Sequence, residues 1–183
     1  MLQLDTGLGT HFAGLGDVPR TAREAEATGF GALWVPETKH DPFLPVALAA
    51  EHTQRIRLGT AVAIAFPRSP MVLANIGWDL AQFSGGRFIL GLGTQVKGHN
   101  ERRFSVPWVP PGPRLRDMVL AIRAIWDCWQ HGPRRSAATY RLLCLNADVQ
   151  NRPGGAWVGR PHRPLARHGR AWRMGSHGAG NHG

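Results

Sequence analysis

Glu37, His40 and Asp41 form a cluster of ionisable side chains directly after a short apolar run at residues 32–35. Such a run is typical of a buried parallel strand, and parallel strands carry functional groups at their carboxyl ends. Imidazole is the side chain best suited to proton transfer near neutral pH, and a nearby carboxylate can orient it. The pattern predicts an acid/base site with His40 and Glu37 as catalytic residues; an ordinary polar loop is the alternative.

A second polar cluster follows two closely spaced glycines, Gly91 and Gly93. Their spacing matches the start of a dinucleotide-binding fingerprint, but Val96 stands where the third glycine is required, so that fingerprint is absent. The segment still offers backbone that a ligand can approach closely, together with the polar ends of Thr94 and Gln95. We expect a ligand contact at these two side chains.

The elements that must position both clusters repeat along the chain. Strand-like segments begin about every 25 to 30 residues, and each is followed by a helical pattern, which is the spacing of βα units with short connections. The predicted strands are 2–4, 32–35, 57–64 and 87–92, and the predicted helices are 17–28, 45–54, 70–83 and 113–130. Right-handed crossovers place all helices on one face if the sheet curls into a barrel, or on two faces if the strand order reverses. The α/β class is therefore predicted, and the periodicity leaves both arrangements open.

Composition sets outer limits on function. The chain has 183 residues, of which 43% are hydrophobic and 19% charged, as in ordinary globular proteins. No apolar run approaches the roughly 20 residues of a membrane span, and the first residues lack the basic start of a signal peptide. We therefore expect a cytoplasmic protein with no membrane partner. Cys128 and Cys144 are expected to be reduced thiols, and no metal-ligand spacing is present, so no metal is expected.

The formal net charge of +10 is concentrated at one end of the chain. Residues 1–132 are nearly balanced, whereas residues 133–183 hold nine arginines, no lysine and a single acid, Asp148. This segment is rich in Arg, Gly and Pro and lacks apolar periodicity, so we expect it to be disordered. The same composition is typical of a GC-rich gene read out of frame, which is a second hypothesis for it.

Four segments carry a resemblance to a known family: ALWVPETKHD at 32–41, RIRLGTAV at 55–62, FPRSP at 66–70 and SGGRFILGLGTQ at 84–95. Through them residues 1–132 resemble the luciferase-like monooxygenase superfamily and, within it, the deazaflavin-dependent oxidoreductases. Members are (β/α)8 TIM barrels that bind a flavin or deazaflavin at the C-terminal mouth. The resemblance implies that residues 1–132 are the N-terminal half of such a barrel, about four βα units, followed by an irregular basic tail.

The resemblance also implies roles for individual residues. The cofactor would be the deazaflavin coenzyme F420, with FMN as the alternative. His40 would lie beside the ring, Asn100 would contact it, and Thr60, Ala61 and Val62 would form a bulge with a non-prolyl cis peptide behind it. Without the resemblance, these three would be interpreted as core strand.

The function implied is hydride transfer between the deazaflavin and a small organic substrate. Strands five to eight of the family have no counterpart in this sequence, so we expect a truncated protein with weak or no activity that self-associates through exposed sheet edges. Two alternatives remain. One is nucleic-acid binding through the arginines of residues 133–183, for which aromatic residues are too sparse to make it the leading hypothesis; the other is a gene relic without function.

Overall fold

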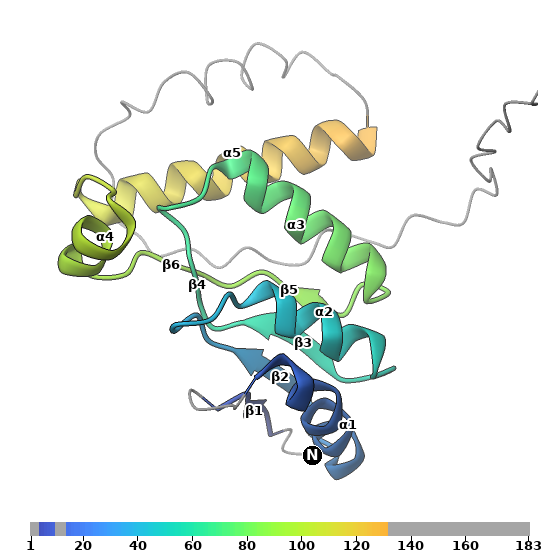
Figure 1. Ribbon diagram of the computed structural model, residues 1–183. Helices are drawn as coiled ribbons and strands as arrows, with labels where there is room; N and C mark the ends of the chain where they lie inside the picture. The colour runs from blue at the N-terminus through green and yellow to red at the C-terminus, as the bar shows by residue number, and fades with distance from the viewer. Residues whose placement is uncertain (1–3, 10–13, 132–183) are drawn as a thin grey trace, which may run out of the picture.

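The computed structural model describes residues 4–9 and 14–131 (Figure 1). Its strands are β1 (Thr6–Gly7), β2 (Ala32–Val35), β3 (Arg57–Thr60), β4 (Ala63–Ile64), β5 (Phe88–Ile89) and β6 (Leu92–Gly93). Its helices are α1 (Val18–Thr28), α2 (Phe43–Glu51), α3 (Pro70–Phe83), α4 (Lys97–Phe104) and α5 (Pro111–His131), with a 3₁₀ turn at Leu15–Asp17 before α1. Strands and helices therefore alternate along most of the described chain.

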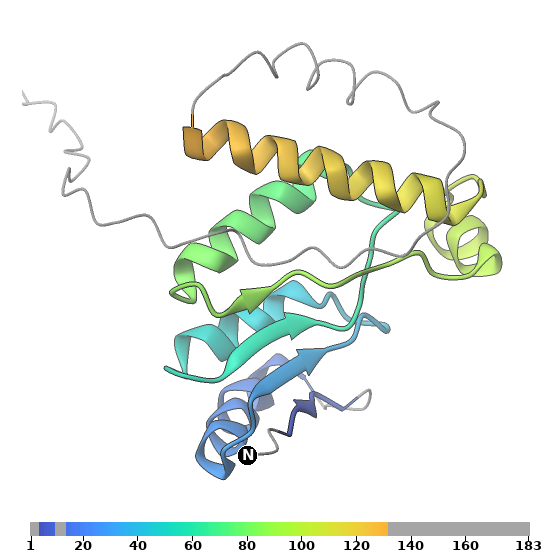
Figure 2. The same ribbon diagram turned by 180° about the vertical axis from the view of Figure 1, so that it is seen from behind.

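The described strands pair in parallel and in chain order. The larger sheet has the order β1-β2-β3-β5, and β4 pairs with β6 beyond it. The helices α1, α2, α3 and α5 pack against one another in chain order: α1 on α2, α2 on α3 and α3 on α5. In Figure 1 α1 and α2 lie in front of the strands, and from behind the strands lie in front of them (Figure 2). The mixed α/β fold with a parallel sheet is confirmed.

The core lies between the sheet and the helices. Leu33, Leu58 and Phe88 are direct neighbours across β2, β3 and β5, and all three are buried. Because neighbouring residues of parallel strands point to the same face, they form one apolar row under the helices. Helix α1 contributes the buried residues of its predicted apolar face, spaced four and three residues apart: Val18, Ala22 and Ala25. Burying this surface is the main stabilising term of the fold.

The opposite face of the sheet carries the alternate residues. Trp34, Gly59 and Ile89 are neighbours across the same three strands. The Trp34 indole lies over Gly59, where a Cβ would come within 2.7 Å of Cε3, and its Nε1 donates a hydrogen bond to Asp5 at 3.1 Å. The Trp34 ring thus fills the space that the missing side chain of Gly59 leaves on this face.

The structure corrects four details of the predicted elements. The first strand is Thr6–Gly7 rather than the predicted 2–4, of which residues 2 and 3 lie outside the described residues. The predicted strands 57–64 and 87–92 are each divided into two short strands. Thr60 explains both divisions, because its hydroxyl donates to the carbonyl oxygen of Gly91 and accepts from the N–H of Gly91, replacing ladder bonds at that point. Helix α4 is an addition that the charged sequence of Lys97–Phe104 did not indicate.

The tail prediction for residues 133–183, and the boundary at residue 132, lie outside the described residues. Within the part of the chain that the structure describes, none of the helices is both long and apolar enough to cross a bilayer.

Candidate functional site

Three segments meet where the parallel strands end: residues 36–42 after β2, residues 61–62 between β3 and β4, and residues 94–96 after β6. We call this region the carboxyl rim. The N–H of Glu37 donates to the carbonyl oxygen of Val62 at 3.3 Å, and the Arg103 side chain of α4 donates to the carbonyl oxygen of Thr38. The rim therefore brings together both polar clusters that the sequence singled out.

Glu37 is a buried carboxylate whose two oxygens both accept hydrogen bonds. Oε2 accepts from the backbone N–H of Ile64 at 2.7 Å and from Nη1 of Arg68 at 2.7 Å, and Oε1 accepts from Nη2 of Arg68 at 3.0 Å. Only 5% of its side chain is exposed. This arrangement suits a group that holds the loop in place better than one that exchanges protons with a substrate.

Arg68, which the sequence analysis did not select, is the centre of this network. Its guanidinium also donates to the Asp41 carboxylate at 3.1 Å and to the carbonyl oxygen of Ile64 at 2.8 Å, and it lies over the Phe43 ring. Burial alone would lower the pKa of Arg68, but the Glu37 and Asp41 carboxylates outweigh burial and raise that pKa above its usual value. Arg68 therefore stays charged between its two partners.

His40 lies half-buried in the loop between these two carboxylates. It follows Glu37 by three residues and precedes Asp41, whose Oδ1 accepts from the N–H groups of Phe43 and Leu44 at the start of α2. The loop that carries the predicted catalytic histidine is thus tied to the network at both ends.

The segment predicted to back a ring separates into a buried and an exposed part. Thr60 is fully buried, and its hydroxyl is used by Gly91. Ala61 and Val62 are exposed at the rim, with 37% of Val62 accessible, and the peptide bond between them is cis, as the resemblance implies. Gly93 makes room for Val62, since a Cβ there would collide with the valine methyl groups. Val62, rather than Thr60, is therefore the side chain that a ligand can touch.

The second predicted cluster also divides. Thr94 and Gln95 are half-buried at the rim, and the Gln95 side chain accepts from the N–H of Val96 at 2.9 Å. Asn100, in the first turn of α4, is fully buried. Its Nδ2 donates to the carbonyl oxygens of Thr94 at 2.9 Å and Val96 at 3.1 Å, so the side chain fixes the backbone of residues 94–96. Its Oδ1 is buried with no hydrogen-bond partner among the described residues.

The rim carries one exposed apolar side chain and several half-buried polar ones. Val62 is exposed and apolar, Thr94 and Gln95 follow β6, which pairs with β4, and His40 lies half-buried in the loop after β2. Such a combination of apolar area with a few polar groups is usual in cofactor sites. In the described ranges 4–9 and 14–131, no three His, Cys, Asp or Glu side chains converge as metal ligands do.

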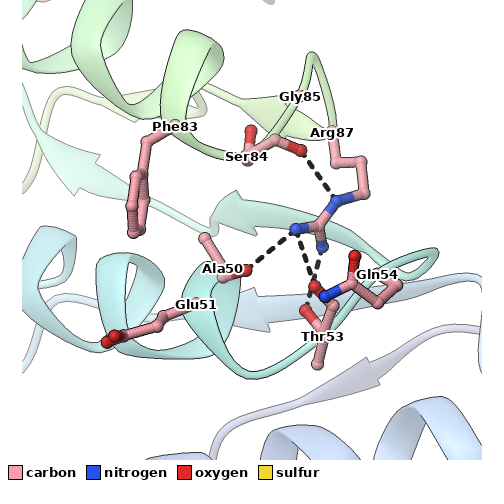
Figure 3. Close-up of a pocket in the computed structure, with 8 residues that line it drawn as sticks. All are labelled: Ala50, Glu51, Thr53, Gln54, Phe83, Ser84, Gly85 and Arg87. Carbon is pink, nitrogen blue, oxygen red and sulfur yellow. Dashed lines mark hydrogen bonds between the residues drawn. The ribbon is translucent and has the colours of Figure 1, made fainter.

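A pocket of about 470 Å³ lies at the opposite end of the sheet, between the loops that enter β3 and β5 (Figure 3). Its lining residues are Ala50, Glu51, Thr53, Gln54, Phe83, Ser84, Gly85 and Arg87. Arg87 makes five hydrogen bonds, to Thr53 and to the backbone carbonyl oxygens of Ala50, Thr53, Ile56 and Ser84. Its donors are therefore used within the protein, and we place the functional site at the rim instead.

The Arg68 network could have been suspected from the sequence. Glu37 and Asp41 are two acids four residues apart, and the FPRSP segment supplies one cation directly after the next strand. Nothing in the sequence indicated that both carboxylates share this guanidinium, because their pairing depends on how the loop after β2 lies against the segment from Val62 to Arg68.

Comparison with known proteins places these observations in a family. The sequence model described as luciferase-like monooxygenase matches residues 2–162. An uncharacterized protein of Mycobacterium tuberculosis is 51% identical over 133 residues, which is 73% of this chain and 38% of that protein. A second M. tuberculosis protein, provisionally named a coenzyme F420-dependent oxidoreductase, is 32% identical over 146 residues, covering 77% of this chain and 39% of that protein. The chain spans about two fifths of the length of these curated relatives.

One solved structure extends the likeness to the fold. The oxygenating constituent of 3,6-diketocamphane monooxygenase from Pseudomonas putida, solved in complex with FMN, superposes with a TM-score of 0.61 at 17% identity. The match covers 69% of this chain and 40% of that one. At this identity it is the arrangement of strands and helices that is shared.

Proposed function

This chain belongs to the luciferase-like monooxygenase family, and from that premise we propose that it contributes the cofactor rim of an oxidoreductase that transfers a hydride between coenzyme F420 and a small organic substrate. The relative named for coenzyme F420 supports the choice of cofactor. FMN is the alternative, since a protein of the same fold binds it. We do not extend the proposal to nucleic-acid binding, because the family match is to an oxidoreductase.

The observation that carries the proposal is the convergence of His40, Val62 and Thr94 at one end of the sheet. The three come from loops after different strands, and a barrel enzyme binds its ligand where such loops meet. The bond between Glu37 and Val62 and the pairing of Ile64 with Gly93 keep the loops adjacent.

We assign the following roles to the chain's own side chains. Val62 would contact one face of the ring, and Thr94 and Gln95 would bond its polar edge. His40 would hold or move the proton at its imidazole nitrogen, because a half-buried histidine can exchange protons with a substrate and with water. Bound F420 would supply the hydride chemistry itself. Glu37, Thr60 and Asn100 would support these groups rather than touch the ligand.

Cofactor phosphates in barrel enzymes are often held by loops after the last strands. The described residues hold the complete loops after β2, β3 and β6, and the chain spans about two fifths of the length of its curated relatives, so we propose that this chain alone binds F420 weakly and turns over little substrate. A pairwise comparison of variants is therefore more informative than an absolute affinity.

Fluorescence titration of coenzyme F420 into the purified chain tests the proposal. Val62→Glu introduces a charge on the ring-facing surface and should weaken binding by tenfold or more, roughly the effect of burying one unpaired charge. Leu120→Glu is the matched control, because Leu120 is 40% exposed on α5 against 37% for Val62. The same titration with FMN decides between the two cofactors. Equal affinity in both variants, or no saturable binding by the unmodified chain, would contradict the proposed site.

A further inference from the structure

We infer that Arg68 is a positioning residue that fixes His40 at the carboxyl rim, an inference that rests on the function proposed above. Its guanidinium bonds Glu37, three residues before His40, and Asp41, the residue directly after it. The short segment that carries the histidine therefore spans two carboxylates held by a single side chain from the loop after β4.

The Glu37 arm anchors the loop to the sheet. Arg68 and Ile64 form a closed set of bonds with Glu37: the carboxylate accepts from the Ile64 N–H at 2.7 Å, and Arg68 donates to the Ile64 carbonyl oxygen at 2.8 Å. Arg68 and Glu37 are largely shielded from water, with 16% and 5% of their side chains exposed. Charge-assisted bonds in such surroundings are stronger than those at a surface, so this arm is the rigid one.

The Asp41 arm anchors the same loop to a helix. Oδ2 of Asp41 accepts from Arg68 at 3.1 Å, while Oδ1 accepts from the N–H of Phe43 at 2.8 Å. Phe43 is the first residue of α2, and its ring lies under the guanidinium at 5.3 Å. A shift of His40 along the rim would thus disturb the start of α2, the sheet or both.

The geometry requires arginine rather than a cation in general. Four N–H groups of Arg68 are directed at Glu37 Oε1, Glu37 Oε2, Asp41 Oδ2 and the Ile64 carbonyl oxygen. Lysine places its three donors on one atom and cannot form the two-pronged contact with Glu37 while reaching Asp41. The Arg68→Lys substitution therefore keeps the charge and removes the positioning.

The test compares Arg68→Lys with Arg87→Lys in the full chain. Arg87 is the matched control, since it is also half-buried and makes five hydrogen bonds, but at the far end of the sheet (Figure 3). The readouts are the NMR signals of the His40 imidazole and the hydrogen exchange of the amides of residues 38–41, each corrected for global stability. We expect Arg68→Lys to shift the His40 signals and to speed exchange of these amides by about tenfold, and Arg87→Lys to leave both unchanged.

An unchanged His40 signal with unchanged exchange in Arg68→Lys would overturn the inference, and so would equal changes in Arg87→Lys. If Arg68→Lys does not fold, Asp41→Asn decides, because asparagine keeps the Oδ1 contact to α2 and replaces the charged Oδ2 acceptor that faces Arg68 with an amide donor. Faster exchange at residues 38–41 in Asp41→Asn supports the inference, and wild-type exchange refutes it. Neither readout uses a cofactor, so failure of the unmodified chain to bind F420 would refute the proposed function separately.

Discussion

At the scale of single residues, the glycines of the sheet are where a small change has the clearest consequence. Gly59 lies under the Trp34 ring, and a Cβ there would come within 2.7 Å of Trp34 Cε3 and 3.0 Å of the Ile89 carbonyl oxygen. Gly59→Ala should lower the free energy of unfolding by about 1–3 kcal/mol, because the indole or the strand must move. Urea unfolding followed by tryptophan fluorescence measures this.

Gly16→Ala provides the control for this prediction. Nothing lies within 4 Å of the Cβ position at Gly16, so this variant should stay within about 0.5 kcal/mol of the unmodified chain. Equal stability of the two variants would mean that Trp34 does not occupy the position described.

The sequence predicted the position of some site residues but not the burial of others. His40, Thr94 and Gln95 follow apolar strands, and that local pattern was sufficient to place them at the rim. The burial of Thr60 and Asn100, in contrast, depends on neighbours about thirty residues away or on a helix that the sequence did not indicate. Hydrogen bonds between segments distant in sequence leave no local pattern.

At the scale of secondary-structure elements, Glu26 joins α1 to the start of β3. Its carboxylate accepts from the backbone N–H groups of Gln54, Arg55 and Ile56 at 2.6–3.2 Å. Burial alone would raise the pKa of Glu26, but these N–H donors and the Arg55 charge outweigh burial and lower that pKa below its usual value of 4.5. The loop before β3 is therefore held by a carboxylate that must be ionised.

Because the folded-state pKa is lowered, the stabilisation by Glu26 is fully present above about pH 4.5 and is lost as the pH falls through the folded-state value. Glu26→Gln should cost about 1–3 kcal/mol near pH 7, and the difference from the unmodified chain should shrink in acid. Glu24→Gln, on the exposed side of α1, should cost less than about 0.5 kcal/mol. Urea unfolding at several pH values tests this, and a cost of Glu26→Gln that grows on acidification would contradict it.

The elements also differ in how well the sequence predicted them. Helix α3 and strand β2 occur at the predicted residues because their signals are local: Ser69 caps α3 and Pro70 begins it, and the apolar run 32–35 has the length of one strand. The interruptions within 57–64 and 87–92 were not predicted, since Thr60 and Gly91 create them together. Helix α4 lacks an apolar face and depends on Asn100 and Arg103, which bond to other loops.

At the scale of the whole molecule, the described part of the sheet is open on two sides. Among the described residues, β1 and β5 each have a strand on one side only. Unpaired edges of this kind favour pairing with another chain. We therefore propose that the chain self-associates through these exposed sheet edges.

Sedimentation velocity over about a hundredfold range of concentration should show a rising average mass. Ile89→Lys places a charge on the edge strand β5 and should shift the association to higher concentration. Leu120→Lys, which alters an exposed residue of α5, should not. A single species with the mass of one chain at every concentration would refute self-association.

We propose that the redox ring binds at the carboxyl rim and not at the opposite end of the sheet. Backbone amide NMR spectra of the full chain, recorded while coenzyme F420 is added, test it most directly. We expect shifted signals at residues 37–41, 61–64 and 93–96 and unchanged signals at 50–54 and 83–87, around the pocket of Figure 3. Shifts confined to the second set, or none at saturating F420, would contradict it.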